Sequence, residues 1–80
     1  MTAVPTVTVM SRSGCHRCSV VIEQVALVVT GTGYRMLVVD VDADPETRAE
    51  YGDQVPVVLI DGNEHDYGSV DVERLRAALR

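Results

Sequence analysis

The 80-residue sequence predicts an α/β fold in which a four-stranded mixed sheet carries helices on both faces. Two observations lead to this fold class. Segments rich in β-branched residues alternate with segments of helical periodicity, which is typical of strand–helix–strand units. Later in the chain, two strand-like segments are joined only by a turn signal, which indicates a hairpin. The predicted order is β-α-β-α-β-β-α, and we expect residues 1–80 to form a single domain.

The first strand and the first helix are predicted within residues 6–30. Thr6–Met10 has the β-branched composition of a strand, and Ser11–Gly14 forms a loop. A helix follows from Cys15 to about Thr30 and ends at the stop signal Gly31. Because valine has a low helix propensity, this helix is predicted from its periodicity rather than its composition. Its apolar side chains recur at helical spacing, at Cys18, Val21, Ile22, Val25, Val28 and Val29.

A second strand and a short helix are predicted next. Tyr34–Val41 has the pattern of a strand, and it runs parallel to the first because a helix connects the two. Leu37–Val39 is continuously apolar, which predicts a strand covered on both faces. Asp44 and Pro45 form a helix start, with an N-cap and a favoured first residue, and this helix ends near Tyr51-Gly52.

A hairpin and a third helix complete the predicted fold. Val57–Ile60 is the third strand, Asp61-Gly62-Asn63 is the hairpin turn, and Glu64–Tyr67 returns antiparallel. Gly68-Ser69 is a second turn. Either Ser69 or Asp71 then caps a final helix, whose inward side chains are Val72, Leu75 and Leu79.

The charge composition excludes several classes of function. Seven arginines and no lysines stand against twelve acidic residues, which gives a formal net charge of −5. A nucleic-acid-binding protein needs a basic surface, and an anionic membrane repels an acidic protein. No apolar run approaches the roughly 20 residues that a bilayer span requires. Because no secretory signal is recognisable, we expect a cytoplasmic protein. We also expect it to be a monomer and to bind neither nucleic acid nor membrane.

The two cysteines carry the chemistry of this sequence. They lie in Cys15-His16-Arg17-Cys18, which follows a predicted strand and loop and opens a predicted helix. The first turn of a helix has unpaired N–H groups and a partial positive charge, and both stabilise a thiolate at Cys15. Positive potential is added nearby by Arg12, by Arg17 and by His16 when it is protonated. Cys18 lies one turn further on the same face, so Cys15 is predicted as the nucleophile and Cys18 as the resolving thiol.

A second motif, Val55-Pro56, precedes the third predicted strand. From the residues alone, Pro56 is a strand-initiating proline, tolerated there because it lacks an N–H group. Together with the cysteines, the order of elements resembles the glutaredoxin family. The resemblance rests on CxxC at a helix start, Val-Pro about 40 residues later, a hairpin, and a Gly-containing turn before the last helix. It covers nearly the whole chain and implies the thioredoxin fold.

The resemblance also implies roles for further residues. It implies a cis peptide bond before Pro56 and substrate contacts through the backbone of Val55. It places Arg12 at the carboxylate of glutathione, and Gly68-Ser69, with Asp71 nearby, at its γ-glutamyl end. Two departures bear on glutathione binding. His-Arg stands between the cysteines in place of the Pro-Tyr typical of dithiol glutaredoxins, and a serine replaces the second glycine of the turn.

The predicted function is that of a thiol–disulfide oxidoreductase of glutaredoxin type. It reduces protein or mixed disulfides with glutathione, another low-molecular-weight thiol or a flavoprotein reductase as electron donor, and it has no tightly bound cofactor. Two alternatives stay open: a metal or iron–sulfur module that uses the CxxC, and a redox-inert adaptor on the same fold.

Metal ligation has weaker support in the sequence. A structural zinc site usually needs four ligands, and besides the cysteines only His16 and His65 offer soft or imidazole donors. We therefore assign no metal ligand. Three alternating acidic residues are interpreted as a solvated strand end and a helix cap, namely Asp40, Asp42 and Asp44.

Overall fold

The computed structural model describes residues 4–79 and contains every predicted strand and helix. One further element, a 3-10 helix, follows the second strand. In chain order the elements are β1 (Thr6–Ser11), α1 (His16–Val29), β2 (Arg35–Asp40), η1 (Val41–Ala43), α2 (Pro45–Tyr51), β3 (Val57–Ile60), β4 (Asn63–Tyr67) and α3 (Val72–Ala78). The predicted order of strands and α-helices is confirmed, and the boundaries differ only slightly from the predicted ones.

The strands form one mixed sheet in the order β2-β1-β3-β4. β1 pairs in parallel with β2, so that Ser11 lies opposite Asp40. β1 pairs antiparallel with β3, where Met10 lies opposite Val57, and β4 returns antiparallel to β3 with a bulge. The carboxyl ends of β1, β2 and β4 therefore share one edge of the sheet with the amino end of β3.

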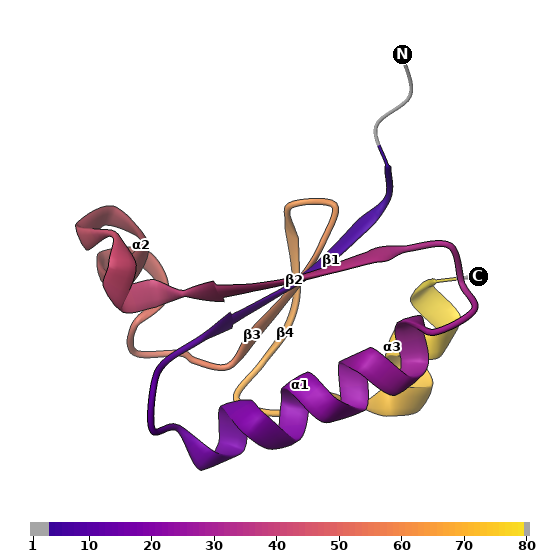
Figure 1. Cartoon of the computed structure of the whole chain (residues 1–80), viewed down its shortest axis with the longest axis horizontal. Coiled ribbons are helices and arrows are strands. Elements are labelled where there is room, and N and C mark those ends of the chain that lie inside the picture. Colours follow the sequence, from indigo (N-terminus) through magenta and orange to yellow (C-terminus); the bar gives the residue numbers. More distant parts are fainter. Residues whose placement is uncertain (1–3, 80) are drawn as a thin grey trace.

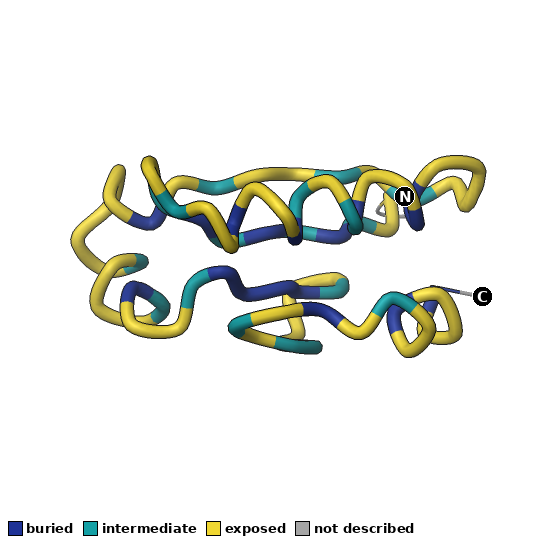
Figure 2. The backbone as a smooth tube through the Cα atoms, turned by 90° about the horizontal axis from the view of Figure 1, so that it is seen from below, coloured by how far each residue is buried: buried dark blue, intermediate teal, exposed yellow. Residues whose placement is uncertain are grey.

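The hydrophobic core lies between the sheet and the helices α1 and α3, which cover the same face (Figure 1). Alternate residues of β1 are buried, and buried residues recur at helical spacing along α1 (Figure 2). Tertiary packing thus holds α1 together despite the low helix propensity of its valines. Fully buried side chains include Val7, Val9, Val21, Val25 and Leu75.

The structure corrects one prediction for β2. The apolar run Leu37–Val39 predicted a strand covered on both faces, and this is wrong. β2 is an edge strand, and the side chains of Leu37 and Val38, which point to opposite faces, are 43% and 50% exposed. A run of apolar residues indicates a strand, but the position of that strand in the sheet depends on the topology of the whole chain.

The short helix α2 lies beyond the carboxyl end of β2, on the opposite side of the sheet from α1 and α3 (Figure 1). Its start is fixed locally, as predicted. The carboxylate of Asp44 accepts a hydrogen bond from the amide of Glu46 (2.9 Å), and Pro45 occupies the first turn. Side chains of residues 45–51 stay outside the core, since none of them is buried. Within residues 4–79, no helix has the length and apolar character needed to cross a membrane.

Candidate active site

The structure places Cys15 at the N-cap of α1, one residue before the helix, at the helix start that the sequence predicts for the CxxC motif. Its sulfur accepts a hydrogen bond from the amide of Cys18 (3.1 Å), and its carbonyl accepts one from the amide of Ser19 (3.2 Å). Cys15 and Cys18 form a disulfide, with their Cα atoms 5.2 Å apart. An N–H group of the first helical turn is thus directed at the sulfur of Cys15.

The two cysteines differ in exposure. Cys18 packs into the interior and is 1% exposed, whereas Cys15 is half-buried. Beside them lies a shallow depression of about 430 Å³. Both cysteines border the depression, and Cys15 is the more exposed of the two. The lining residues come from the end of β1, the following loop and the first turns of α1, and they are Ser11–Cys15, His16, Cys18, Ser19 and Ile22.

A tight turn delivers Cys15 to the start of α1. The amide of Cys15 donates a hydrogen bond to the carbonyl of Arg12 (3.2 Å). Gly14, within this turn, has a φ of +78°, a left-handed conformation that other residues rarely adopt. The glycine that precedes the first cysteine therefore allows the chain to leave β1 and enter the helix within a few residues.

The Val55-Pro56 peptide bond is cis, as the resemblance implies. Pro56 is buried and directly precedes β3, whose first residue, Val57, lies opposite Met10 near the end of β1. The carbonyl of Pro56 accepts a hydrogen bond from the amide of Gly68 (2.8 Å). The sheet register thus brings the Val-Pro loop and the turn after β4 to the edge where the cysteine loop begins.

The turn before α3 also reaches this edge. Asp71 is the N-cap of α3, because its carboxylate accepts a hydrogen bond from the amide of Arg74 (3.1 Å). The carboxylate of Asp66 in β4 accepts one from the amide of Asp71 (3.3 Å). Of the two predicted caps, Asp71 is the one used, and Ser69 is exposed. Contacts of Gly68, Ser69 and Asp71 with a thiol remain a prediction.

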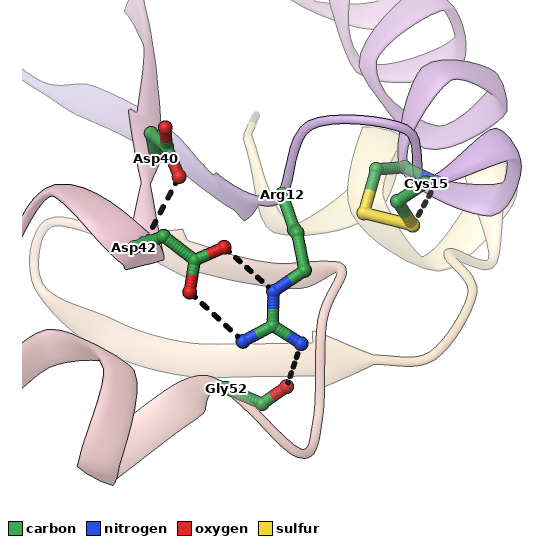
Figure 3. A network of polar contacts seen from close by, with 6 residues as sticks. Arg12, Cys15, Asp40, Asp42 and Gly52 are labelled. Carbon is green, nitrogen blue, oxygen red and sulfur yellow. Dashed lines mark hydrogen bonds and ion pairs between the residues drawn. A yellow bond between two sulfur atoms is a disulfide. The ribbon is translucent and has the colours of Figure 1, made fainter.

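The side chain of Arg12 points to η1 and α2 (Figure 3). Its Nε and Nη2 atoms donate to the two carboxylate oxygens of Asp42 (2.8 and 3.1 Å), and Nη1 donates to the carbonyl of Gly52 (3.3 Å). Hydrogen bonding between Arg12 and Asp42 raises the pKa of Arg12 and lowers the pKa of Asp42. The amide of Asp42 in turn donates to the carboxylate of Asp40 (2.9 Å). Arg12 therefore joins the cysteine loop to two other segments.

Sequence reasoning missed Asp42 and Gly52. The sequence predicts only a solvated strand end at Asp42, whereas its carboxylate pairs with Arg12, 30 residues earlier. One signal for this pair was available, because parallel strands end at the same edge, and Arg12 follows β1 while Asp42 follows β2. Gly52 was recognised only as a helix end. Between residues 4 and 79, no group of three or more His, Cys, Asp or Glu side chains is arranged to hold a metal ion.

The fold matches solved structures of thioredoxin type. A structural genomics target from X. campestris has a TM-score of 0.74 and 30% identity, over 91% of this chain and 93% of that chain. A thioredoxin variant from Halobacterium salinarum has a TM-score of 0.72 at 20% identity, over 95% and 72% of the two chains. A domain of alkylhydroperoxide reductase AhpF from Enterococcus faecalis has a TM-score of 0.73 at 25% identity, over 98% and 39%. The chain therefore has the thioredoxin fold.

Curated relatives occur in mycobacteria. Uncharacterized proteins of Mycobacterium tuberculosis and Mycobacterium bovis are each 46% identical over 80 aligned residues, which cover 94% of this chain and 82% of those proteins. Residues 6–80 match the model of the glutaredoxin-like domain (DUF836). With its CxxC at a helix start and its cis Val-Pro bond, this chain belongs to the glutaredoxin-like domain family.

Proposed function

We propose that this chain is a thiol–disulfide oxidoreductase in which Cys15 is the nucleophile and Cys18 the resolving thiol. The observation that carries the proposal is the position of Cys15 at the N-cap of α1, with the amide of Cys18 donating to its sulfur. In the dithiol form, the same amide and the partial positive charge of the helix end stabilise a thiolate at Cys15. The exposure of the two cysteines supports the same roles, because Cys15 is half-buried whereas Cys18 is almost completely buried.

The reaction proceeds through a mixed disulfide. The thiolate of Cys15 attacks one sulfur of the substrate disulfide, so that a new sulfur–sulfur bond forms and the other substrate sulfur leaves as a thiolate. Cys18 then loses its proton and attacks the sulfur of Cys15, which releases the second substrate thiolate. The Cys15–Cys18 disulfide remains. Two electrons have passed from the dithiol to the substrate, whose two sulfurs take up protons.

An external donor must return the protein to the dithiol form. We propose glutathione, another low-molecular-weight thiol or a flavoprotein reductase for this role, in the cytoplasm, with protein disulfides as substrates. The likeness to a domain of a reductase polypeptide supports a protein donor. The residues proposed to receive the substrate border the same edge of the sheet as Cys15, and they are His16, Val55, Pro56, Gly68, Ser69 and Asp71.

Cysteine substitutions test this proposal directly. The reduced wild-type protein is expected to reduce a peptide disulfide, and its more reactive thiol to titrate below the ordinary value of about 8.5. Cys15→Ser abolishes the reaction, while Cys18→Ser still forms a mixed disulfide at Cys15 but cannot resolve it. Mass spectrometry of the trapped adduct identifies the bonded cysteine. Full activity in Cys15→Ser, or an adduct at Cys18 of the wild-type protein, would refute the assignment.

A further inference from the structure

Arg12 connects three segments that are distant in the sequence. Its backbone carbonyl accepts a hydrogen bond from the amide of Cys15, and its guanidinium binds the carboxylate of Asp42 and the carbonyl of Gly52 (Figure 3). Asp42 lies in η1, directly after β2, and Gly52 ends α2. Gly52 also stands only a few residues before Val55 along the chain. One side chain thus links the cysteine loop to the segment that leads into the Val-Pro loop.

The space around Gly52 fits this role. Gly52 is buried, and a Cβ atom added there would lie 3.1 Å from Nη2 of Arg12 and only 2.4 Å from the backbone carbonyl of Arg48. A larger residue would therefore displace either the end of α2 or the guanidinium. The absence of a side chain at this position allows Arg12 to approach the backbone closely enough to donate to it.

We infer that Arg12 is a positioning residue, which holds the loop of Cys15 at a fixed distance from the Val55-Pro56 loop. Asp42 fixes the orientation of the Arg12 guanidinium. The inference rests on the proposed thiol–disulfide exchange, to which it adds two residues. It differs from the role that the resemblance implies for Arg12, which is binding of the glutathione carboxylate. Asp42 takes two of the five guanidinium N–H donors and the carbonyl of Gly52 takes a third, so a second carboxylate would compete for a guanidinium that is already oriented by Asp42.

A comparison of two disulfide substrates isolates this role. In the proposed reaction, a peptide disulfide presents its sulfur to Cys15 and, as the resemblance implies, its backbone to Val55. Its reaction therefore depends on the distance between the two loops. Bis(2-hydroxyethyl) disulfide has no peptide backbone and engages only the sulfur of Cys15. A residue that positions one loop against the other therefore affects the first substrate more than the second.

The test uses the reduced full chain in single-turnover reactions with each disulfide. Arg12→Lys keeps the charge but loses the paired geometry, and Asp42→Asn keeps the shape but loses the carboxylate. Asp53→Asn is the matched control, since Asp53 acts on Arg12 only through its charge. The Arg12–Asp42 pair is more than one-third exposed, so neither substitution disturbs the core. A far-UV circular dichroism spectrum verifies that each variant is folded.

Arg12→Lys and Asp42→Asn are expected to slow the reaction with the peptide disulfide roughly three- to tenfold, and that with bis(2-hydroxyethyl) disulfide less than about twofold. Asp53→Asn is expected to change neither rate. The inference would be overturned if both substrates were slowed equally or if neither were slowed. It would also be overturned if Asp42→Asn lowered the KM for glutathione and left the rate with the peptide disulfide unchanged. If Cys15→Ser reacts as fast as the wild-type protein, the proposed function itself fails, independently of Arg12.

Discussion

At the residue scale, the partner of Arg12 decides what its charge can do. An unpaired arginine beside a cysteine loop raises the positive potential at the thiol. Here the carboxylate of Asp42 offsets much of that charge and turns the guanidinium toward η1 and Gly52. In the mechanism that we propose, the N-terminus of α1 is therefore the main source of thiolate stabilisation at Cys15, through the amide of Cys18 that donates to its sulfur.

The lowered pKa of Asp42 predicts a pH dependence of stability. A carboxyl group whose pKa is lower in the folded state than in the unfolded state stabilises the protein above its unfolded pKa, and this contribution is lost as the pH falls through the folded pKa. The urea midpoint of the wild-type protein is therefore expected to exceed that of Asp42→Asn at about pH 6. This small difference should shrink steadily as the pH falls below about 3.9, the ordinary pKa of an aspartate. A difference that stays constant across this range would contradict the assigned ion pair.

At the scale of elements, short helices in this fold depend on their caps. Asp44 and Asp71 each accept a hydrogen bond from an amide in the first turn, at the starts of α2 and α3. Asp44 could be identified from the sequence because an aspartate followed by proline is a strong local signal. Ser69 and Asp71 were equivalent in the sequence, and only the path of the turn after β4 separates them.

Removing the α3 cap is expected to destabilise the protein measurably. Asp71→Ala leaves an amide of the first turn without its acceptor, which costs about 1 kcal/mol in free energy of unfolding. Ser69→Ala, at an exposed neighbouring position, is the control and should change stability by less than about 0.5 kcal/mol. Urea unfolding followed by circular dichroism compares the two. Equal losses in both variants would show that Asp71 is not the cap.

At the scale of the whole molecule, most of the core lies on one side of the sheet. The molecule measures 32 × 30 × 15 Å, and α1 and α3 pack against the same face (Figure 1). A small protein with such a thin core depends strongly on each large buried side chain. Leu75 of α3 is among the largest of them and is fully buried.

Truncation of Leu75 is therefore expected to be severe. Leu75→Ala should reduce the free energy of unfolding by roughly 2–5 kcal/mol, out of a total of about 5–15 kcal/mol for a protein of this kind. Leu27→Ala is the same chemical change at a side chain that is 78% exposed, and it should cost less than about 0.5 kcal/mol. Chemical denaturation measures both values. If the two variants lost similar stability, the assigned core would be wrong.

Features that depend on residues close together in the chain could be predicted from the sequence. The order of elements, a helix that begins at the CxxC motif and the start of α2 all follow from periodicity and capping signals. The exposure of Leu37 and Val38 could not be predicted, because β2 becomes an edge strand only when the chain adds β3 on the far side of β1. The contact between Arg12 and Asp42 is likewise non-local, since it needs two parallel strands to end side by side.

The edge position of β2 has a consequence for handling the protein in solution. Along the outer side of residues 35–40, backbone donors and acceptors meet no further strand among residues 4–79, and apolar side chains flank them on both faces. An exposed edge strand of this kind is a template to which an extended segment of another polypeptide can pair. Charged side chains, which oppose such pairing, occur in β2 only at its two ends, at Arg35 and Asp40. We therefore expect β2 to be a site of aggregation in concentrated or partly unfolded preparations.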